Sequence, residues 1–249
     1  MKIGIVTGAS SGIGREFVYQ LESAYELDEL WLIARREDRL METSARLQQA
    51  KGVVIPMDLT SVEEMNMLRR KIEDESPEIC VLINNAGHGI IGAFEDISIN
   101  DQLGMIDLNV NVLVRLTHIC LSYMSEGSII YQIASLNAFM PVPDGAVYSA
   151  TKAFVLNFAF SLYQELKKKG IHVIAVSPGA VGTEWLEIAS NGVMKAPPFA
   201  ASASDVVRLA IRDAKKKKLN STYGLRNKGN LILLRVLSKK FFFRLLSKV

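Results

Sequence analysis

The stretch Lys2-Ile3-Gly4-Ile5-Val6 leads directly into Thr7-Gly8-Ala9-Ser10-Ser11-Gly12-Ile13-Gly14, and this junction decides the fold. The first residues form a short apolar run that is typical of a buried strand. The glycines then allow the backbone to turn tightly and to approach a ligand closely. A strand, a glycine-rich turn and a helix start in this order favour a site where backbone N–H groups meet a pyrophosphate. We expect its ligands to be Gly8, Ser10, Ser11, Gly12, Ile13 and Gly14.

Short apolar runs alternate with helical patterns along the chain. Further strands are expected at residues 30–33, 53–55, 80–83, 128–131 and 173–176, and helices at 13–24, 36–50, 62–74, 100–124 and 148–169. The runs are apolar on both faces, as strands covered by helices on each side must be. The pattern predicts an α/β fold with a doubly wound parallel sheet of Rossmann type. Because no linker divides the chain, residues 1–249 are expected to form one domain.

The composition limits the classes of protein that remain. Apolar residues make up 49% of the 249 residues, which is enough for a sizeable core. The cysteines, Cys80 and Cys120, lie in apolar runs and are expected to be reduced thiols. The histidines show no metal-ligand spacing, so no metal site is expected. Without a leader or a long uncharged apolar run, we expect a cytoplasmic protein that does not span a membrane.

The net charge of +3 hides an asymmetry between the body of the chain and its end. From Val206 onward thirteen Lys and Arg stand against one acid, whereas residues 1–205 hold sixteen basic and twenty-five acidic residues. The segment 219–249 is therefore interpreted as basic and amphipathic. It can dock on its own fold, which we favour, or touch a membrane surface, a carrier protein or another subunit. No nucleic-acid role is expected, because no binding motif accompanies the charge.

The catalytic residues are predicted from fixed spacings. Tyr148 and Lys152 are four residues apart and so share one helix face, and Ser135 lies thirteen residues before Tyr148. An ammonium beside a phenol favours the phenolate, which lowers a pKa that is ordinarily about 10. Such a tyrosine can exchange a proton with a substrate oxygen. Together with the glycine turn, the pattern indicates hydride-transfer chemistry.

The residues at the end of the second strand select between NAD(H) and NADP(H). An acid that would bind a free ribose 2′-hydroxyl is missing there, and Arg35 stands in its place. A guanidinium can stack on adenine and pair with a 2′-phosphate, so the sequence favours NADP(H) over NAD(H). Arg36 and Arg39 are interpreted as the start of a solvated helix. Asp58 and Leu59 are expected at the adenine.

These residues together resemble the short-chain dehydrogenase/reductase family over about residues 1–185. The ordered pieces are the TGxxxGIG head, Asp58, the NNAG run at 84–87, Asn109, Ser135, the YxxxK pair, and Pro178-Gly179 with Thr183. Two positions depart from the pattern: Ala134 stands where many relatives have a second serine, and Ser11 stands where some NADP-preferring relatives have a basic residue.

The resemblance implies a catalytic tetrad of Asn109, Ser135, Tyr148 and Lys152. Tyr148 would handle the proton, Lys152 would lower its pKa and hold the nicotinamide ribose, and Ser135 would donate to the substrate oxygen. Asn109 fits the family spacing better than Asn111. The resemblance further implies a homodimer or homotetramer. It also implies cofactor contacts from Asn85, Ala86, Gly87, Tyr148, Lys152, Pro178, Gly179, Val181 and Thr183.

Substrate contacts are expected beyond the carboxyl ends of the strands. The segment 184–204, with Gly192 and a proline pair, is expected to form a lid. The apolar residues predicted to line the pocket are Leu136, Phe139, Met140, Val142, Trp185 and Leu186. Such a lining suits a bulky hydrophobic alcohol or ketone, for example a hydroxysteroid, although loops that merely pack on each other would have the same composition.

The sequence thus predicts an NADP(H)-dependent oxidoreductase that interconverts a secondary alcohol and a ketone or aldehyde. Reduction of a 3-oxoacyl group on an acyl carrier protein is an alternative, because the basic end could attract an acidic carrier. A non-catalytic dinucleotide-binding sensor or scaffold is an alternative of another class. Against it, all four tetrad residues are present.

Overall fold

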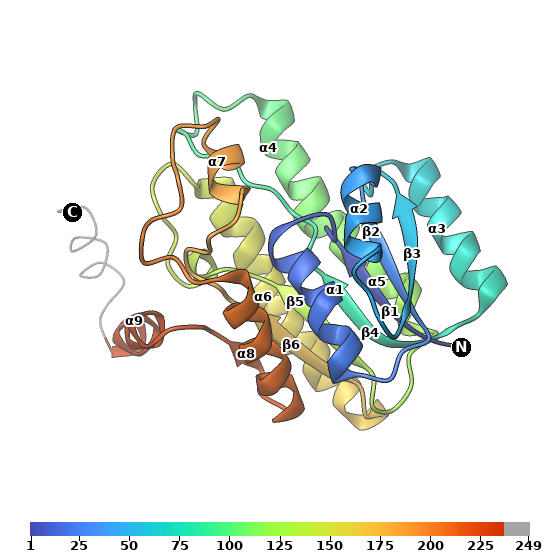
Figure 1. Cartoon of the computed structure of the whole chain (residues 1–249). Coiled ribbons are helices and arrows are strands. Elements are labelled where there is room, and N and C mark those ends of the chain that lie inside the picture. Colours follow the sequence, from blue (N-terminus) through green and yellow to red (C-terminus); the bar gives the residue numbers. More distant parts are fainter. Residues whose placement is uncertain (237–249) are drawn as a thin grey trace.

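The computed structural model describes residues 1–236 and contains one seven-stranded sheet (Figure 1). All its strands are parallel, in the order β3-β2-β1-β4-β5-β6-β7. The strands are β1 (Lys2–Thr7), β2 (Glu29–Ala34), β3 (Lys51–Pro56), β4 (Glu78–Asn84), β5 (Ile129–Ile133), β6 (His172–Val176) and β7 (Asn220–Ser221). The predicted Rossmann-type sheet is therefore confirmed, and β7 is a strand that the apolar pattern did not reveal.

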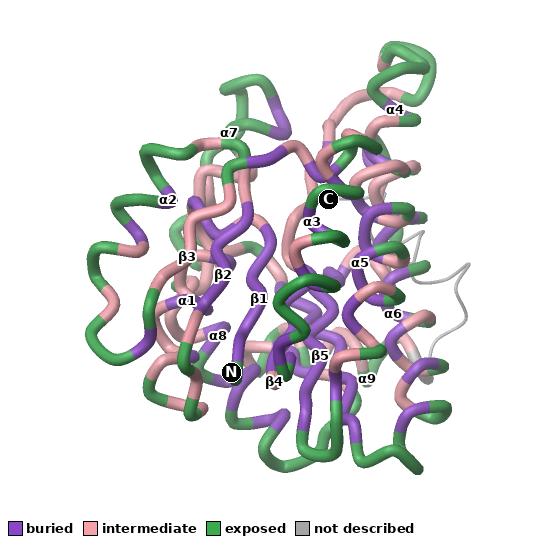
Figure 2. Tube along the Cα trace, turned by 90° about the vertical axis from the view of Figure 1, so that its right-hand side faces the viewer, coloured by how far each residue is buried: buried purple, intermediate pink, exposed green. Residues whose placement is uncertain are grey.

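Helices cover both faces of the sheet. The α-helices are α1 (Gly12–Ala24), α2 (Glu37–Ser44), α3 (Val62–Glu75), α4 (Ile99–Ile106), α5 (Leu113–Leu121), α6 (Ala146–Leu166), α7 (Trp185–Ala189), α8 (Ala203–Lys215) and α9 (Leu225–Val236). Helices α1 and α8 pack on one face, and α3, α5 and α6 on the other. Successive strand residues point to opposite faces, so Ile5 and Val6 belong to different cores. Figure 2 shows the buried strands between helices whose outer surfaces are exposed.

The strand order places the cleft of the domain. From β1 the chain proceeds outward to β2 and β3, then crosses back to β4 on the other side of β1. The loops after β1 and β4 therefore leave the sheet in opposite directions, and ligands of such sheets bind in the crevice between them. The glycine turn follows β1, and Asn85 follows β4. The glycine turn and Asn85, two parts of the predicted cofactor site, thus lie at this crevice.

Two helices differ from their predicted extents. Helix α2 ends at Ser44 instead of residue 50, because a carboxylate of α1 interrupts it: Glu22 Oε1 accepts hydrogen bonds from the backbone N–H groups of Gln48, Gln49 and Ala50. The predicted helix 100–124 is three consecutive pieces, α4, a π-helical turn (Asp107–Val112) and α5. Its described residues 99–121 are the one described segment long and apolar enough to span a membrane, which is weak evidence because α5 packs on β4.

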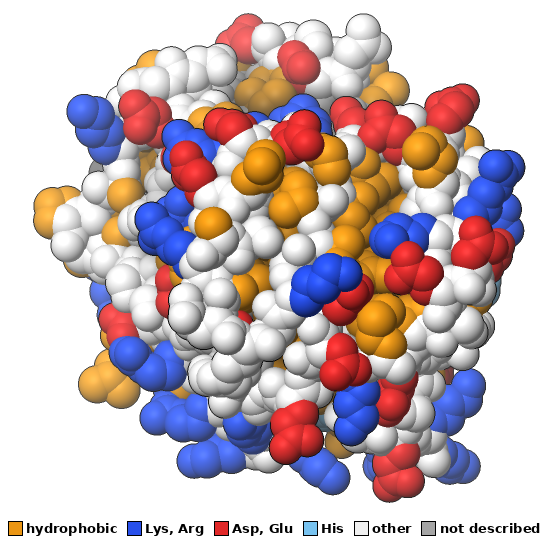
Figure 3. Space-filling model, turned by 45° about the vertical axis from the view of Figure 1, so that its right-hand side comes forward, with side chains coloured by type: hydrophobic (Ala, Val, Ile, Leu, Met, Phe, Trp, Pro, Cys, Tyr) orange, Lys and Arg blue, Asp and Glu red, His pale blue; other side chains and the backbone are white. Residues whose placement is uncertain are grey.

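The described end of the chain differs from the prediction of one basic amphipathic segment over 219–249. Asn220 and Ser221 extend the sheet as β7, and the described helix that follows is α9, at the edge of the molecule (Figure 1). Leu231 and Leu234 of the predicted apolar stripe are half-buried. Its other members, Phe241, Phe242, Leu245 and Val249, lie outside the described residues. On the face shown in Figure 3, acids and bases are interspersed, and basic side chains gather along its lower left edge.

Candidate active site

The glycine turn has the geometry of a phosphate cradle. Gly8 and Gly12 adopt φ angles of 65° and 53°, in the left-handed region that glycine enters without strain. A Cβ atom on Gly14 would lie 2.2 Å from the carbonyl oxygen of Gly8, so only glycine fits there. The turn leads into α1, whose first N–H groups have no partner within the helix. These features fit the pyrophosphate of a dinucleotide.

Thr7 joins the ends of β1 and β4. Its hydroxyl donates to the carbonyl oxygen of Ile83 and accepts from the backbone N–H groups of Asn85 and Ala86. In return, Asn85 Nδ2 donates to the carbonyl oxygens of Thr7 and Gly8, at 2.9 and 3.3 Å. Asn85 and Ala86 are therefore fixed against the glycine turn, as a cofactor-lining role requires. The contribution of Thr7 was not predicted.

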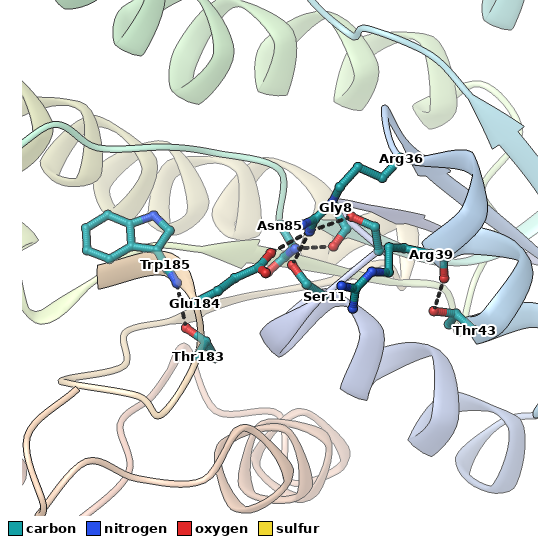
Figure 4. Close-up of polar contacts among 10 residues, drawn as sticks. Gly8, Ser11, Arg36, Arg39, Thr43, Asn85, Thr183, Glu184 and Trp185 are labelled. Carbon is teal, nitrogen blue, oxygen red and sulfur yellow. Dashed lines mark hydrogen bonds and ion pairs between the residues drawn. The ribbon is translucent and has the colours of Figure 1, made fainter. Parts of the chain in front are cut away.

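Two arginines follow β2, and the structure separates their positions. Arg35 is exposed. Hydrogen bonds from Thr60 lower the pKa of Asp58 and burial lowers the pKa of His88, and the charge of Arg35 adds to both effects. Arg36 was expected to start a solvated helix, and this interpretation is wrong. Its Nη2 atom contacts the glycine turn at Ser11 Oγ (2.9 Å) and Ser10 Oγ (3.2 Å), together with a carboxylate oxygen of Glu184 (2.5 Å) (Figure 4). Arg36 is the N-cap residue of α2, with an extended backbone (φ −88°, ψ 94°).

Asp58 and Leu59 follow β3 in the expected place. One carboxylate oxygen of Asp58 accepts from both the backbone N–H and the hydroxyl of Thr60, and these hydrogen bonds lower the pKa of Asp58. Leu59 is buried in the core beneath. Asp58 is half-buried, and its hydrogen bonds from Thr60 outweigh the opposing effect of that burial on its pKa.

Tyr148 and Lys152 lie one turn apart on α6. The ammonium of Lys152 donates to the carbonyl oxygen of Ile133 at 2.8 Å and lies 5.8 Å from the centroid of the Tyr148 ring. Burial lowers the pKa of Lys152 to about 8. Gly87 lies opposite: a Cβ atom placed on it would be 3.5 Å from the Lys152 Nζ. The YxxxK pair and the NNAG run thus converge on one place.

The environment of Tyr148 differs from the expectation that Lys152 lowers its pKa. Burial raises the pKa of Tyr148 to about 12, and the nearby Ser135 hydroxyl offsets only part of this rise. The indole of Trp185 packs on the phenol with ring centroids 5.0 Å apart, which contributes to the burial. Ser135 itself is buried after β5, and its Oγ accepts from the backbone N–H of Asn137. The three predicted side chains are together, with the phenol held in its protonated form.

Asn109 lies in the π-helical turn and is buried. Its Oδ1 accepts from the backbone N–H of His88 at 3.0 Å, and its Nδ2 donates to the carbonyl oxygen of His88 at 2.9 Å and to Thr151 Oγ1 at 3.0 Å. The amide therefore ties the NNAG loop to α6, beside Lys152. Asn111, the rival candidate, is exposed and bonds to Asp107 on its own helix. The preference for Asn109 agrees with this geometry.

The loop after β6 lies across the glycine turn. A Cβ atom on Gly12 would lie 3.1 Å from a methyl carbon of Thr183, so the two segments are in close contact. Pro178 is buried, and its carbonyl oxygen accepts from the backbone N–H of Leu136 at 2.9 Å. Gly179 and Val181 continue this segment, where Val181 forms a bridge with Ala201.

The predicted substrate residues divide into two groups. Trp185 lies at the phenol, and Gly89, which was not predicted, has room for no side chain between these two rings. Leu136 is buried, and the half-buried Phe139 packs against the core. Met140, Val142 and Leu186 are half-buried. The surface hollow between α2 and β3 contains none of these residues, and the described residues contain no metal-binding cluster.

Comparison with known proteins agrees with this geometry. A family profile described as short chain dehydrogenase matches residues 2–192. An uncharacterized oxidoreductase of Staphylococcus epidermidis is 32% identical over 197 residues, which cover 78% of this chain and 84% of that protein. A similar oxidoreductase of Staphylococcus aureus is 33% identical over 184 residues, which cover 73% of this chain and 79% of that protein.

Solved structures share the fold over nearly the whole chain. A short-chain dehydrogenase from Sphingobium yanoikuyae in complex with NADPH has a TM-score of 0.82 at 27% identity, covering 100% of this chain and 96% of that one. A bulky-bulky ketone specific alcohol dehydrogenase from Comamonas testosteroni has a TM-score of 0.77 at 26% identity, covering 100% and 95%.

The parallel sheet, the glycine cradle and the tyrosine–lysine pair define a dinucleotide-dependent oxidoreductase. More particularly, the chain belongs to the short-chain dehydrogenase/reductase family, as the sequence resemblance implied. It is an NAD(P)-dependent enzyme of that family, so the alternative of a non-catalytic sensor is set aside.

Proposed function

We propose that this enzyme interconverts a secondary alcohol and a ketone or aldehyde with NADP(H). The observation that carries the proposal is the convergence of Tyr148, Lys152 and Ser135 at the loop that Asn109 holds, beside a glycine turn shaped for a dinucleotide. A bound nicotinamide would supply or accept the hydride at its C4 atom. The chain's own residues then have to position the substrate oxygen and manage one proton.

Each tetrad residue has a physical role in that step. In the reductive direction the Tyr148 hydroxyl gives its proton to the substrate oxygen, and its raised pKa means that the proton is present at neutral pH. Ser135 stabilises the charge that develops on that oxygen. The Lys152 ammonium stabilises the phenolate left behind, which is the state where its charge matters most. Asn109 positions Lys152 indirectly, through Thr151 and the loop at His88.

The preference for NADP(H) is supported by charge at the end of β2. Arg35 and Arg36 bring two guanidinium groups to the crevice, and Arg36 already holds an anionic oxygen next to Ser10 and Ser11. A phosphate is bound by the same donors. The Sphingobium relative was solved with NADPH, which accords with the proposal.

The proposed substrate is bulky and apolar, such as a hydroxysteroid. Trp185, Leu136 and Leu186 supply apolar surface beside the phenol, and we assign segment 184–204 as the lid. The name of the Comamonas relative, which acts on bulky-bulky ketones, supports this class. Reduction of a carrier-bound 3-oxoacyl group is the competing reaction. It predicts a rate that depends on an acidic carrier and falls with salt.

Tyr148→Phe tests the reaction. The variant keeps the ring against Trp185 but has no proton to transfer, so turnover should fall by about 10²-fold or more while the Kd for the cofactor stays within about twofold. The assay is cofactor absorbance over a panel of steroid, acyl and aromatic ketones, with cofactor binding measured by titration. Phe160→Tyr on the same helix, at a half-buried ring outside the tetrad, is the matched control. Wild-type turnover by Tyr148→Phe would refute the assignment.

The enzyme is proposed to act in the cytoplasm as a homodimer or homotetramer. Helix α4 exposes Ile99 and Leu103, and α6 exposes Phe154, so apolar surface is available for subunit contacts. Sedimentation velocity at two protein concentrations tests the oligomer.

A further inference from the structure

The outward face of α9 carries exposed aliphatic side chains, whereas the outward face of an ordinary surface helix is polar. Leu225, Ile232 and Leu233 are 87%, 64% and 40% exposed. An amide lies on the inner side instead, where Asn227 Nδ2 donates to the carbonyl oxygen of Tyr223 at 2.8 Å. Leu231 and Leu234 are half-buried on the inner side, so α9 has aliphatic side chains on two faces, and the outward ones form an apolar surface that can bind something else.

Positive charge flanks this face. Arg226 and Lys228 are exposed on α9, and the Arg226 guanidinium lies 4.9 Å above the ring of Phe199, itself 69% exposed. The chain from Val206 onward carries thirteen basic residues and one acid. Apolar side chains with basic flanks match an anionic lipid surface, where the apolar groups enter the acyl boundary and the cations meet phosphate groups.

The position of α9 connects this surface with the active site. A Cβ atom on Gly179 would lie 2.7 Å from Asn227 of α9 and 3.1 Å from Leu136, the residue after Ser135. We propose that α9 and Phe199 dock the enzyme on anionic phospholipid. A substrate that partitions into the bilayer would then enter beside the loops that carry Ser135 and Gly179.

Vesicle co-sedimentation of the full chain tests the proposal. We expect binding to phosphatidylglycerol vesicles, at least about tenfold weaker binding to phosphatidylcholine vesicles, and a decline with salt. Ile232→Ser with Leu233→Ser should weaken binding to phosphatidylglycerol by about tenfold or more. The matched control is Val62→Ser with Met67→Ser on α3, which removes apolar side chains of similar exposure (51% and 66%).

Three results would overturn the proposal. One is equal sedimentation with both lipids, and another is unchanged binding by the α9 variant. The third is a wild type that ignores vesicles while the α9 variant falls from a larger oligomer to a smaller one, because α9 would then be a subunit interface. Far-ultraviolet circular dichroism of each variant confirms that it is folded, so that loss of binding reports on the surface alone.

A second inference concerns Glu184 and rests on the NADP(H) preference proposed above. Its carboxylate is bound by Arg36, which also contacts Ser10 and Ser11 (Figure 4). The ion pair is half-exposed and bridges the end of β2 to the segment after β6. A carboxylate and a phosphate use the same guanidinium donors. We infer that Glu184 occupies the place of the cofactor's 2′-phosphate and competes with it for Arg36.

Glu184 also connects the two ends of the crevice. Thr183 before it contacts Gly12 in the turn, and Trp185 after it packs on Tyr148. Displacement of the carboxylate by a phosphate would therefore release the backbone at the indole that covers the phenol. Glu184 thus couples the recognition of the cofactor's 2′-phosphate to the position of Trp185 over Tyr148.

Calorimetric binding of nucleotides that lack nicotinamide tests this coupling. The probes are adenosine 2′,5′-bisphosphate and ADP. Glu184→Gln should tighten binding of the bisphosphate by about tenfold and binding of ADP by much less, because one competing charge–charge hydrogen bond is removed. Arg36→Gln should weaken the bisphosphate, and Glu187→Gln on the same short helix is the charge-matched control.

The outcomes separate the two proposals. Equal affinities of the bisphosphate in wild type and Glu184→Gln would overturn the competition, even if NADP(H) is preferred. A wild type that binds the bisphosphate no better than ADP would overturn the NADP(H) preference and the competition together. Trp185 fluorescence, with Trp185→Phe as the blank, should change on addition of bisphosphate and not of ADP. An unchanged signal contradicts the coupling.

Discussion

The Lys152→Met variant measures how much the buried charge of Lys152 lowers the free energy of unfolding. Lys152 is 6% exposed, and burial lowers its pKa from 10.5 to about 8. One pKa unit corresponds to about 1.4 kcal/mol, so the charged lysine costs roughly 3 kcal/mol at neutral pH. Methionine has a similar length and no charge. Its substitution leaves the Ile133 carbonyl without its donor, at a cost of about 1 kcal/mol. We therefore expect a variant without turnover that is about 2 kcal/mol more stable.

The pH dependence isolates the electrostatic part of that difference. The pKa of Lys152 is lower in the folded chain, so between about pH 8 and 10.5 the unfolded chain binds more protons. Wild-type stability therefore rises with pH in this window, and the advantage of Lys152→Met shrinks by about 2 kcal/mol between pH 7 and about 9.5. The raised pKa of Tyr148, about 12, acts in the opposite direction only above about pH 10.

Urea unfolding followed by circular dichroism at these two pH values, at one protein concentration, gives the free energies. The change in packing and the lost hydrogen bond contribute equally at both pH values, so they cancel in the comparison. A stability difference that stays constant from about pH 7 to 9.5 would show that Lys152 keeps an ordinary pKa, and the reasoning would be wrong.

Three further substitutions test the cofactor end. Gly14→Ala would place a Cβ atom 2.2 Å from the Gly8 carbonyl oxygen, so we expect a loss of about 1–3 kcal/mol in thermal unfolding and no cofactor binding. Thr7→Val leaves the backbone N–H of Ala86 without its acceptor, while that of Asn85 keeps the Ile83 carbonyl oxygen, and should cost about 1–2 kcal/mol in urea unfolding; a neutral result would contradict the role of this hydroxyl. Arg35→Asp should shift preference towards NAD(H), which fluorescence titration of both cofactors measures; an unchanged ratio would place selection elsewhere.

Local patterns explain why much of this protein could be predicted from its sequence. The apolar runs predict six strands because buried parallel strands need no more than an apolar run of the right length. The YxxxK spacing predicts the common face of Tyr148 and Lys152 because both lie within one helix. Positions set by tertiary contacts could not be predicted in this way. Helix α2 ends early because Glu22, a residue of α1, binds the following backbone N–H groups.

The sequence also could not show which way particular side chains point. Of the two arginines after β2, only Arg35 was predicted to bind an anion, whereas Arg36 contacts the glycine turn in the structure. The basic end was recognised as amphipathic, whereas the face that α9 turns outward follows from its packing beside Gly179. Burial raises the pKa of Tyr148, and one of the side chains that cover its ring, Trp185, is thirty-seven residues away in the sequence.

Because of the π-helical turn at Asp107–Val112, the long helix contains one residue more than a regular α-helix of the same length would. Deleting a single residue there would restore uniform winding, and α4 and α5 would keep their faces because one wide turn takes up about one extra residue. The resulting helix would be more regular, yet the amide of Asn109 would no longer meet His88 and Thr151. The fold can therefore tolerate a change of length in this segment, whereas the reaction cannot. We expect proteins with an insertion or deletion there to be folded but inactive.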